Sequence, residues 1–240
     1  MKTIGIIGGM GPEATARFYM EIIRLFQRKY AATNDSDYPK MFICNLPIPD
    51  VLYDLENEVG VREMLLTAAR KLESCSCEFI AIPCNSVQVF IKDLRSSVGI
   101  PVINIVEETA RFLKDRNFAK VGIMGTETTV RSRLYEQALE PFGISSVPVT
   151  TLEQKDISGI IESTMAGRRS MADVEIIASI AKRMCTEGAQ CIVLGCTELP
   201  LLDLCMPEIQ FIDTIKVLAQ VTVNRATEYQ SKGFNLGSQL

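Results

Sequence analysis

The sequence contains two halves that repeat the same pattern of short apolar segments in the same order. Three blocks pair up: residues 3–8 (TIGIIG) with 120–125 (KVGIMG), 77–86 (CEFIAIPCNS) with 189–198 (AQCIVLGCTE), and 102–104 (VIN) with 211–213 (FID). Self-similarity over a whole chain indicates how its domains are arranged, because each copy is expected to fold into the same arrangement of strands and helices. The repeat therefore predicts two similar domains that arose by duplication.

Within each half, short runs rich in β-branched residues alternate with longer amphipathic segments, a pattern typical of an α/β fold with mostly parallel strands. We expect strands at residues 3–7, 41–45, 79–83, 102–105, 121–124, 146–149, 191–194 and 211–212, and helices at 13–30, 60–74, 106–116, 131–141, 171–187 and 216–230. Because the second copy of the repeat ends near residue 213, we expect the last helix to return to the first domain. The predicted domains are residues 1–105 plus 214–240, and residues 106–213.

Charge and hydropathy restrict the partners of such a chain. It has 25 Lys and Arg residues against 29 Asp and Glu residues, a net charge of -4, so it has no basic field that would attract nucleic acid or anionic lipid. No apolar run approaches the roughly 18 residues that a membrane helix needs, and the first residues do not form a signal-type apolar stretch. We expect a cytoplasmic protein whose partner is a small molecule.

The chain has no histidine, which removes a large part of enzyme chemistry. Ser-His-Asp and Cys-His nucleophilic pairs, histidine acid/base catalysis and histidine-ligated zinc are all excluded. Eight cysteines remain, and in the cytosol they should be reduced. There is no Cys-x-x-Cys, and Cys75-x-Cys77 has no matching second pair, so we expect neither a metal nor a redox centre. We interpret six of the cysteines as small buried residues without a chemical role: Cys44, Cys75, Cys77, Cys185, Cys191 and Cys205.

Cys84 and Cys196 differ from the other cysteines because each follows directly on an apolar strand, at equivalent positions of the repeat. Ligands of open α/β sheets bind beyond the carboxyl ends of the strands. Two domains related by a pseudo-twofold axis would place these thiols on opposite sides of the interdomain cleft. Inverting a stereocentre requires one group to take a proton from one face and another to return one on the other face, and two thiols have matched basicity for this. Asn85, Ser86 and Thr197 could donate hydrogen bonds to a substrate carboxylate.

The residues around these cysteines also resemble a known family. Residues 1–12 (MKTIGIIGGMGP), 83–86 (PCNS) and 195–198 (GCTE), in this order and at these spacings, are similar to the aspartate/glutamate racemase superfamily, and most of all to aspartate racemases. The similarity covers nearly the whole chain. It implies an amino-acid racemase that uses no cofactor, has two Rossmann-like domains and forms a homodimer, with Cys84 and Cys196 as the two acid/base residues. The same resemblance implies substrate-binding roles for Met10, Asn85, Ser86, Thr126, Thr129, Thr197 and Glu198.

The sequence departs from the pattern of aspartate racemases at three positions. Gln88 stands where related sequences have a histidine, Val51 where they have an arginine, and Met165 where they have a lysine. Two cations that would hold a side-chain carboxylate are missing, so racemase chemistry is better supported than aspartate as the substrate. Four arginines are candidates for a substitute charge, although each reads as a solvated surface residue: Arg131, Arg133, Arg168 and Arg169.

Competing interpretations differ in how much of the sequence they explain. Residues 9–14 (GMGPEA) fit the loose dinucleotide-binding pattern, but no acidic residue ends the next strand about 20 positions later, as that fold requires. No lysine stands at a strand end beside a glycine-rich turn, which argues against a pyridoxal phosphate enzyme. Two alternatives stay open. One is a racemase or isomerase of the same superfamily that acts on a different amino acid or small carboxylic acid; the other is a non-catalytic amino-acid-binding protein, against which the presence of both thiols argues.

Overall fold

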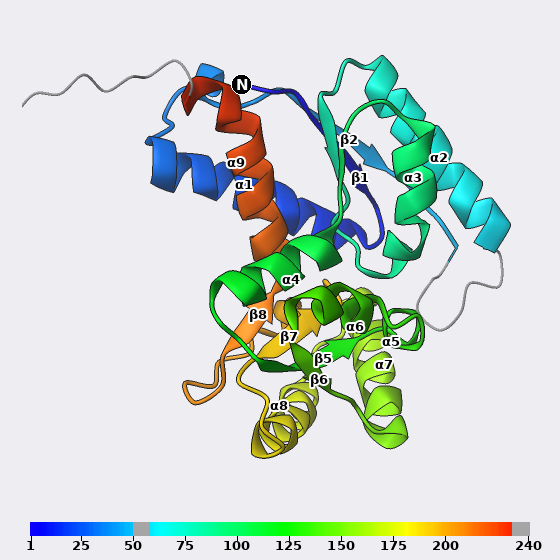
Figure 1. Cartoon of the computed structure of the whole chain (residues 1–240), viewed down its shortest axis with the longest axis vertical. Helices are drawn as coiled ribbons and strands as arrows, with labels where there is room; N and C mark the ends of the chain where they lie inside the picture. Colours follow the sequence, from blue (N-terminus) through cyan, green and yellow to red (C-terminus); the bar gives the residue numbers. More distant parts are fainter. Residues whose placement is uncertain (50–57, 232–240) are drawn as a thin grey trace, which may run out of the picture.

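The computed structural model describes residues 1–49 and 58–231, which fold into two four-stranded parallel sheets (Figure 1). The first sheet has the order β2-β1-β3-β4 and the second has the equivalent order β6-β5-β7-β8. The strands are β1 (Ile4–Gly8), β2 (Met41–Asn45), β3 (Phe79–Ala81), β4 (Val102–Ile103), β5 (Lys120–Gly125), β6 (Ser145–Val147), β7 (Ile192–Gly195) and β8 (Phe211–Asp213). The predicted α/β class with two similar domains is confirmed.

Helices follow nearly every strand, as parallel pairing requires. The helices are α1 (Pro12–Tyr30), α2 (Glu58–Ser74), α3 (Ile91–Ser97), α4 (Ile105–Asp115), α5 (Glu127–Arg131), α6 (Leu134–Leu139), α7 (Thr151–Met165), α8 (Met171–Thr186) and α9 (Thr214–Ser231), with short 3-10 turns at Asp35–Asp37, Ser86–Phe90, Glu140–Phe142 and Leu199–Leu202. None of the helices in these described parts is long and apolar enough to cross a membrane.

Three helical regions differ from the expectation. The short helix α3 (Ile91–Ser97) was not predicted. The predicted helix 131–141 is interrupted, because Arg133 takes a left-handed conformation (φ 52°) between α5 and α6. Helix α7 has no counterpart among the predicted helices. Its centre combines Gly159 with serine and threonine, which weakens the apolar periodicity. Its start does carry a recognisable signal, because Thr150 and Glu153 form a reciprocal capping box.

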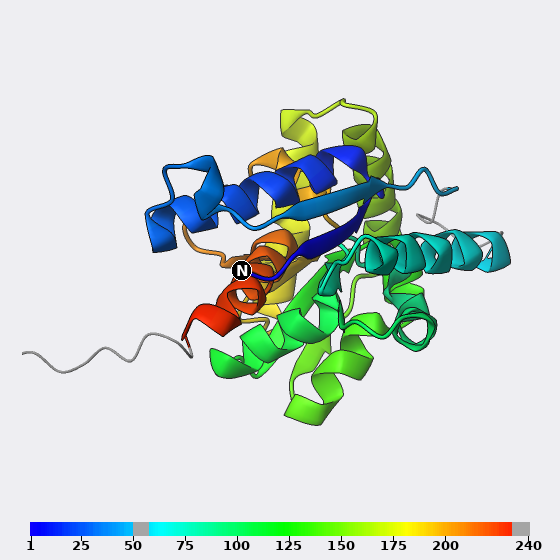
Figure 2. The same ribbon diagram turned by 90° about the horizontal axis from the view of Figure 1, so that it is seen from above.

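Both sheets are covered on both faces, which explains why their strands read as continuous apolar runs. Figure 2 shows α1 and α2 on opposite sides of the first sheet. Side chains of α2 and α3, such as Leu65 and Leu94, pack with Ile80 in one outer core. Helices α7 and α8 supply Ile161 and Ile177 to the corresponding outer core of the second sheet. The inner faces of both sheets share a single third core.

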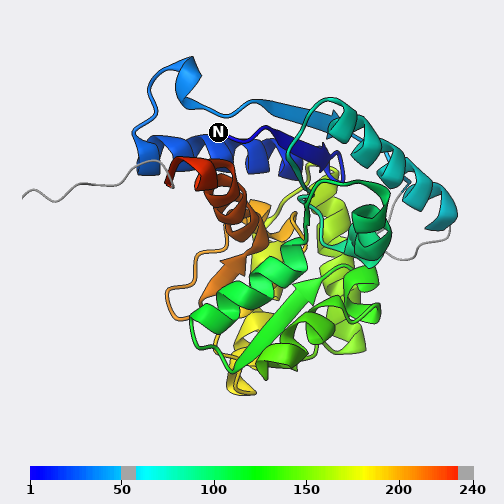
Figure 3. The ribbon, with the colours of Figure 1, turned by 45° about the horizontal axis from the view of Figure 1, so that its top comes forward.

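The inner core is completed by the end of the chain. Helix α9 packs against α1 and α4, so the last helix lies beside the first (Figure 3). Lys2 donates its backbone N–H to the carbonyl of Ala226 (2.9 Å), and its ammonium pairs with Glu228 (3.0 Å). The domain division at residues 105 and 213 itself stays a prediction.

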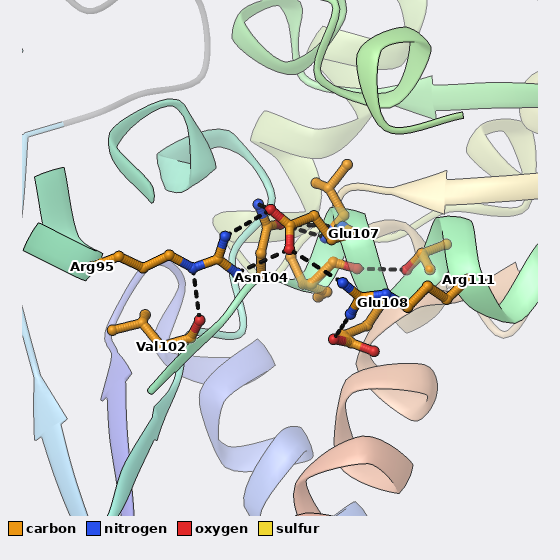
Figure 4. A network of polar contacts seen from close by, with 9 residues as sticks. Arg95, Val102, Asn104, Glu107, Glu108 and Arg111 are labelled. Atoms are coloured by element: carbon orange, nitrogen blue, oxygen red, sulfur yellow. Dashed lines mark hydrogen bonds and ion pairs between the residues drawn. The ribbon is translucent and has the colours of Figure 1, made fainter. Parts of the chain in front are cut away.

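Helix α4 carries the chain from the first sheet to the second, and a polar network fixes where it begins (Figure 4). Asn104 Oδ1 accepts the backbone N–H groups of Val106 (2.9 Å) and Glu107 (3.3 Å), which caps the helix. Arg95 of α3 binds both carboxylate oxygens of Glu107 at 2.9 Å and the carbonyl of Val102 at 3.2 Å. Bidentate pairing of this kind restrains direction as well as distance, so the crossover is held to α3.

Candidate active site

A pocket lies where the carboxyl ends of β1, β3, β5 and β7 meet. It has a volume of about 110 Å³, which is room for a small molecule. The lining comes from both halves of the chain: Gly9, Met10, Gly11, Pro12, Ile48, Pro49, Cys84, Asn85, Ser86, Thr126, Ile161, Met165, Gly195, Cys196, Thr197 and Glu198. This is where ligands of open α/β sheets bind.

Both cysteines singled out by the repeat line this pocket. Cys84 comes three residues after the end of β3, and Cys196 follows directly on β7. They are almost equally buried, with 5% and 4% of their surface exposed. Negative charge on Cys84 is one of the causes that raise the pKa of Cys196, which reflects how near the two thiols lie. One pocket thus receives a thiol from each repeat.

The environment of both thiols favours the protonated form. Burial raises the pKa of Cys84 from its ordinary value of 9.0 to about 12, although the backbone N–H groups of Val87 and Ser86 act in the opposite direction. Burial is also the largest cause that raises the pKa of Cys196, followed by the charge of the Glu198 carboxylate and its hydrogen bond to the thiol. The thiol form therefore predominates at both sulfurs at neutral pH when no ligand is bound, and racemisation starts from the minor fraction in which one of them has ionised.

Glu198 is a buried carboxylate at the centre of the second half of the site, with 6% of its surface exposed. Its Oε2 accepts hydrogen bonds from the thiol of Cys196 and from the hydroxyl of Thr197, both at 3.0 Å. Its Oε1 accepts the backbone N–H of Gly11 at 3.2 Å. The carboxylate thus joins Cys196 to the loop that follows β1.

Three hydroxyls form a cluster that joins the two halves. Ser86 Oγ lies 2.8 Å from Thr126 Oγ1 and 3.3 Å from Thr129 Oγ1, and Thr129 Oγ1 accepts a hydrogen bond from Thr126 Oγ1 at 2.9 Å. Thr126 also caps α5 by accepting the backbone N–H of Thr129. Ser86 and Thr126 line the pocket, whereas Thr129 stands behind them and does not.

Asn85 lines the pocket but uses its amide within the protein. Its Oδ1 accepts the phenolic hydrogen of Tyr135 (2.7 Å), and its Nδ2 donates to Thr214 Oγ1 (3.3 Å). Thr214 Oγ1 in turn donates to the carbonyl of Leu194 in β7. These contacts tie the residue beside Cys84 to the second sheet.

The loop that carries Met10 is shaped by two glycines and a threonine. A Cβ on Gly8 would lie 2.2 Å from Thr15 Cγ2, and Gly9 has a φ of +91° with backbone of Leu46 against its Cα. Thr15 Oγ1 accepts the N–H of Gly9 and donates to the carbonyl of Gly11, both at 2.9 Å. Only glycine fits both positions, and the resulting loop places Met10 and Gly11 in the pocket wall.

The rest of the lining is apolar. Ile48 and Pro49 come from the segment after β2, and Ile161 and Met165 from α7. Within residues 1–49 and 58–231, the pocket lining contains no lysine or arginine. Val51 lies outside the described residues, and the sequence of residues 50–57 (DVLYDLEN) contains no basic residue either.

Two of the four arginines considered as substitute cations already have acidic partners. Arg169 pairs with Glu13, an ion pair that joins α1 to the segment between α7 and α8, and Arg131 lies 3.5 Å from Glu127. Arg133 and Arg168 do not line the pocket. The described residues also contain no group of three or more Cys, Asp and Glu side chains that could hold a metal ion.

Sequence reasoning and the structure agree on most of the pocket wall. Of the predicted site residues, Met10, Cys84, Asn85, Ser86, Thr126, Cys196, Thr197 and Glu198 line the pocket, and Thr129 does not. Ile48, Pro49 and Ile161 were missed because isolated apolar residues give no signal of a site. The resemblance also implied that the loop of residues 8–11 lines the site, and Gly9 and Gly11 do line the pocket, whereas Gly8 does not. Pro12 and Gly195 lie inside the quoted motifs, where proximity to the predicted residues could have included them.

Comparisons with known proteins agree with this geometry. Residues 7–222 match the family described as Asp/Glu/hydantoin racemase. The broad specificity amino-acid racemase RacX of Bacillus subtilis is 30% identical over 95% of this chain and 100% of its own length. The crystal structure of an aspartate racemase homologue from Pyrococcus horikoshii superposes with a TM-score of 0.78 at 28% identity, covering 95% of this chain and 100% of that one. The aspartate racemase of Picrophilus torridus gives a TM-score of 0.80 at 26% identity, covering 96% and 98%.

Proposed function

The chain belongs to the Asp/Glu/hydantoin racemase family and is an amino-acid racemase, and we propose that it inverts the α-carbon by a two-base mechanism in which Cys84 and Cys196 exchange protons with opposite faces of the substrate. The observation that carries this proposal is the pair of buried thiols, one from each repeat, in the wall of a single small pocket. The reaction needs no cofactor, because the thiols supply both the base and the acid.

The proton inventory of one turnover is balanced. One cysteine, as thiolate, takes the α-proton and becomes a thiol, and the electron pair of the C–H bond stays on the substrate as a carbanion delocalised into its carboxylate. The other cysteine, as thiol, gives its proton to the opposite face and becomes a thiolate. The product is the enantiomer, and the two thiols have exchanged protonation states.

The polar residues of the pocket provide the means to hold the substrate and stabilise this carbanion. Charge flows from the α-carbon into the carboxylate, so hydrogen bonds to that group strengthen as the proton leaves. We assign this role to the hydroxyls of Ser86, Thr126 and Thr197, which line the pocket from both halves. Thr129 supports the first two from behind. Asn85 has little hydrogen-bonding capacity left for the substrate, because both its amide oxygen and its amide nitrogen already bond groups of the protein. Its contribution is to hold the position of the pocket wall.

Aspartate is the substrate that the sequence resemblance implies, and it remains the first candidate to test. A specific observation favours a second class, amino acids with uncharged side chains. Once the polar groups have engaged the α-carboxylate and α-ammonium, the lining that remains for the side chain is Ile48, Pro49, Ile161 and Met165. A side-chain carboxylate left there without a cation would be desolvated at a cost of several kcal/mol.

The test is proton NMR of the purified protein in D₂O with both enantiomers of aspartate, glutamate and a panel of neutral amino acids, without added cofactor. Loss of the α-proton signal together with appearance of the other enantiomer supports the proposal and identifies the substrate. Absence of exchange with every amino acid would contradict it. Sedimentation of the same sample tests the homodimer that the resemblance implies.

A further inference from the structure

The carboxylate of Glu198 forms a hydrogen bond with only one of the two thiols. Cys196 donates to Glu198 Oε2 at 3.0 Å, whereas within residues 1–49 and 58–231 Cys84 has no carboxylate acceptor. We propose that Glu198 is a positioning residue that keeps the proton on Cys196, so that Cys84 ionises first and acts as the base towards the enantiomer that the resting enzyme processes. This rests on the proposed function, which makes the two thiols the acid/base pair.

The groups around Cys84 complete the asymmetry. Two backbone N–H groups, those of Ser86 and Val87, donate towards its sulfur and stabilise negative charge there. Cys196 receives only one such donor, the N–H of Glu198, and the carboxylate of the same residue opposes it. The charge of Glu198 raises the pKa of Cys84 as well, but only Cys196 adds a direct hydrogen bond to that carboxylate. Because the two sulfurs are almost equally buried, we assign the difference between them to this hydrogen bond and to the backbone donors.

Glu198 cannot easily turn away from Cys196. Its two oxygens are engaged by separate donors, Thr197 Oγ1 and Cys196 Sγ on Oε2 and the N–H of Gly11 on Oε1. A buried carboxylate that lost these partners would be left unsatisfied, at a cost of several kcal/mol. The carboxylate therefore stays next to Cys196.

Turnover that starts with Cys84 as the base ends in the less stable of the two protonation states of the thiol pair. After Cys84 has taken the α-proton and Cys196 has given one, a Cys196 thiolate stands against the Glu198 carboxylate, and two like charges in contact repel each other. The starting form, with a Cys84 thiolate and a Cys196 thiol, is restored when Cys196 takes a proton from water and Cys84 releases one to water. The two enantiomers are equally stable, so their kcat/KM values must agree, and the asymmetry appears in kcat and KM taken separately.

Site-resolved alkylation measures the order of ionisation without any substrate, because the thiolate is the species that reacts. The exposed cysteines are first removed as Cys75→Ser and Cys205→Ser, and the remaining sites are followed by mass spectrometry of peptides after limited treatment with iodoacetamide at about pH 8. We expect Cys84 to react about tenfold faster than Cys196, which corresponds to a difference of one pKa unit. Equal rates, or faster reaction of Cys196, would overturn the inference.

Glu198→Gln then removes the charge while keeping the size of the side chain. We expect Cys196 to react about tenfold faster than before and the preference for Cys84 to disappear. The matched control is Glu127→Gln, which neutralises a half-exposed carboxylate next to Thr126 in sequence and should leave the ratio of the two rates unchanged. An unchanged ratio in Glu198→Gln would also overturn the inference. Both rates can rise, because the charge of Glu198 acts on both thiols, so the ratio of the two rates is the quantity that decides.

The two hypotheses fail in different ways. Racemisation with equal labelling of both thiols would reject the role of Glu198 and leave the two-base mechanism standing. Preferential labelling of Cys84 without exchange of any amino acid would reject the proposed function, while the asymmetry of the thiols would remain.

Discussion

Tyr135 donates a hydrogen bond of 2.7 Å to Asn85 Oδ1, from a helix of the second half to the residue that follows Cys84 in the first. Both side chains are buried, with 1% and 2% of their surfaces exposed. Burial raises the pKa of the Tyr135 phenol well above its usual range, so the group remains a donor at any pH at which the protein is folded. The position of one thiol is therefore set by a residue of the opposite half.

Tyr135→Phe should lower the free energy of unfolding by about 1–3 kcal/mol, because it leaves Asn85 Oδ1 buried without its donor. Racemase activity should fall as well, through displacement of Cys84. Urea unfolding measures the first effect. The matched control is Tyr30→Phe. The hydroxyl of Tyr30, a half-exposed residue, lies 3.0 Å from Thr227 Oγ1, and its loss should lower the free energy of unfolding by less than about 0.5 kcal/mol. Equal losses in the two variants would contradict the role given to Asn85.

Cys84→Ala and Cys196→Ala should each reduce racemisation by about 10²–10⁴-fold, since each removes an acid/base group from one face. Either variant can still exchange the α-proton of one enantiomer, which NMR in D₂O detects as deuterium uptake without inversion. Cys44→Ala and Cys185→Ala serve as controls, because neither sulfur lines the pocket. Substantial loss in these controls would show that the catalytic pair has been assigned wrongly.

Met165→Lys should shift substrate preference towards aspartate and glutamate by placing a cation in the apolar part of the pocket. Relative to neutral amino acids, the ratio of kcat/KM should change by about three- to tenfold, as expected for a charge pair that keeps contact with solvent, because 53% of the Met165 surface is exposed. Met171→Lys adds the same charge at a position that is also exposed but does not line the pocket, and should not change the ratio. If both variants behave alike, the side chain of the substrate does not approach Met165.

Stability should fall as the pH rises above 9. Burial raises the pKa of Cys77 from 9.0 to about 11 and that of Cys191 to about 12. Between these values the unfolded chain loses protons that the folded chain retains, so the stabilisation is complete below pH 9 and is lost as the pH approaches the folded values. Each thiol contributes a slope of about 1.4 kcal/mol per pH unit.

Urea unfolding from about pH 8 to about pH 10.5 measures that slope. Cys191→Ala should be less stable overall, because it leaves a cavity, but its stability should depend less steeply on pH. Cys205→Ala at the exposed surface is the control and should preserve the slope. A slope that is the same in all three proteins would rule out ionisation of Cys191 as its cause.

The strands, and the meeting of Cys84 and Cys196 in one pocket, could be predicted from the sequence because both depend on local signals that the duplication repeats. Cys84 and Cys196 follow equivalent apolar runs, and parallel strands bring their carboxyl ends to one place. Tyr135 and Ile161 could not be found in this way. Their roles depend on contacts with residues far away in sequence, and Ile161 lies in α7, whose weak apolar periodicity concealed the helix itself.

The part of the pocket that we assign to the side chain of the substrate was predictable only in part. The absence of lysine at position 165 is visible in the sequence, but the partner of Arg169 is not. Its pairing with Glu13 depends on how the start of α1 lies against the segment that follows α7. Thr129 shows the converse limit, because the family resemblance placed it in the site, whereas its hydroxyl bonds other hydroxyls behind the lining.

The return of α9 to α1 has a consequence for how the chain is made. Leu218, Ala219, Val223 and Ala226 of α9 are fully buried in the same core as Phe18 and Ile22 of α1. During synthesis, the first half leaves the ribosome with this apolar face of α1 uncovered, and its cover arrives only after the whole second half has been translated. The half that is synthesised first therefore completes its core last, and until α9 emerges the exposed apolar face of α1 is a site at which the nascent chain can aggregate.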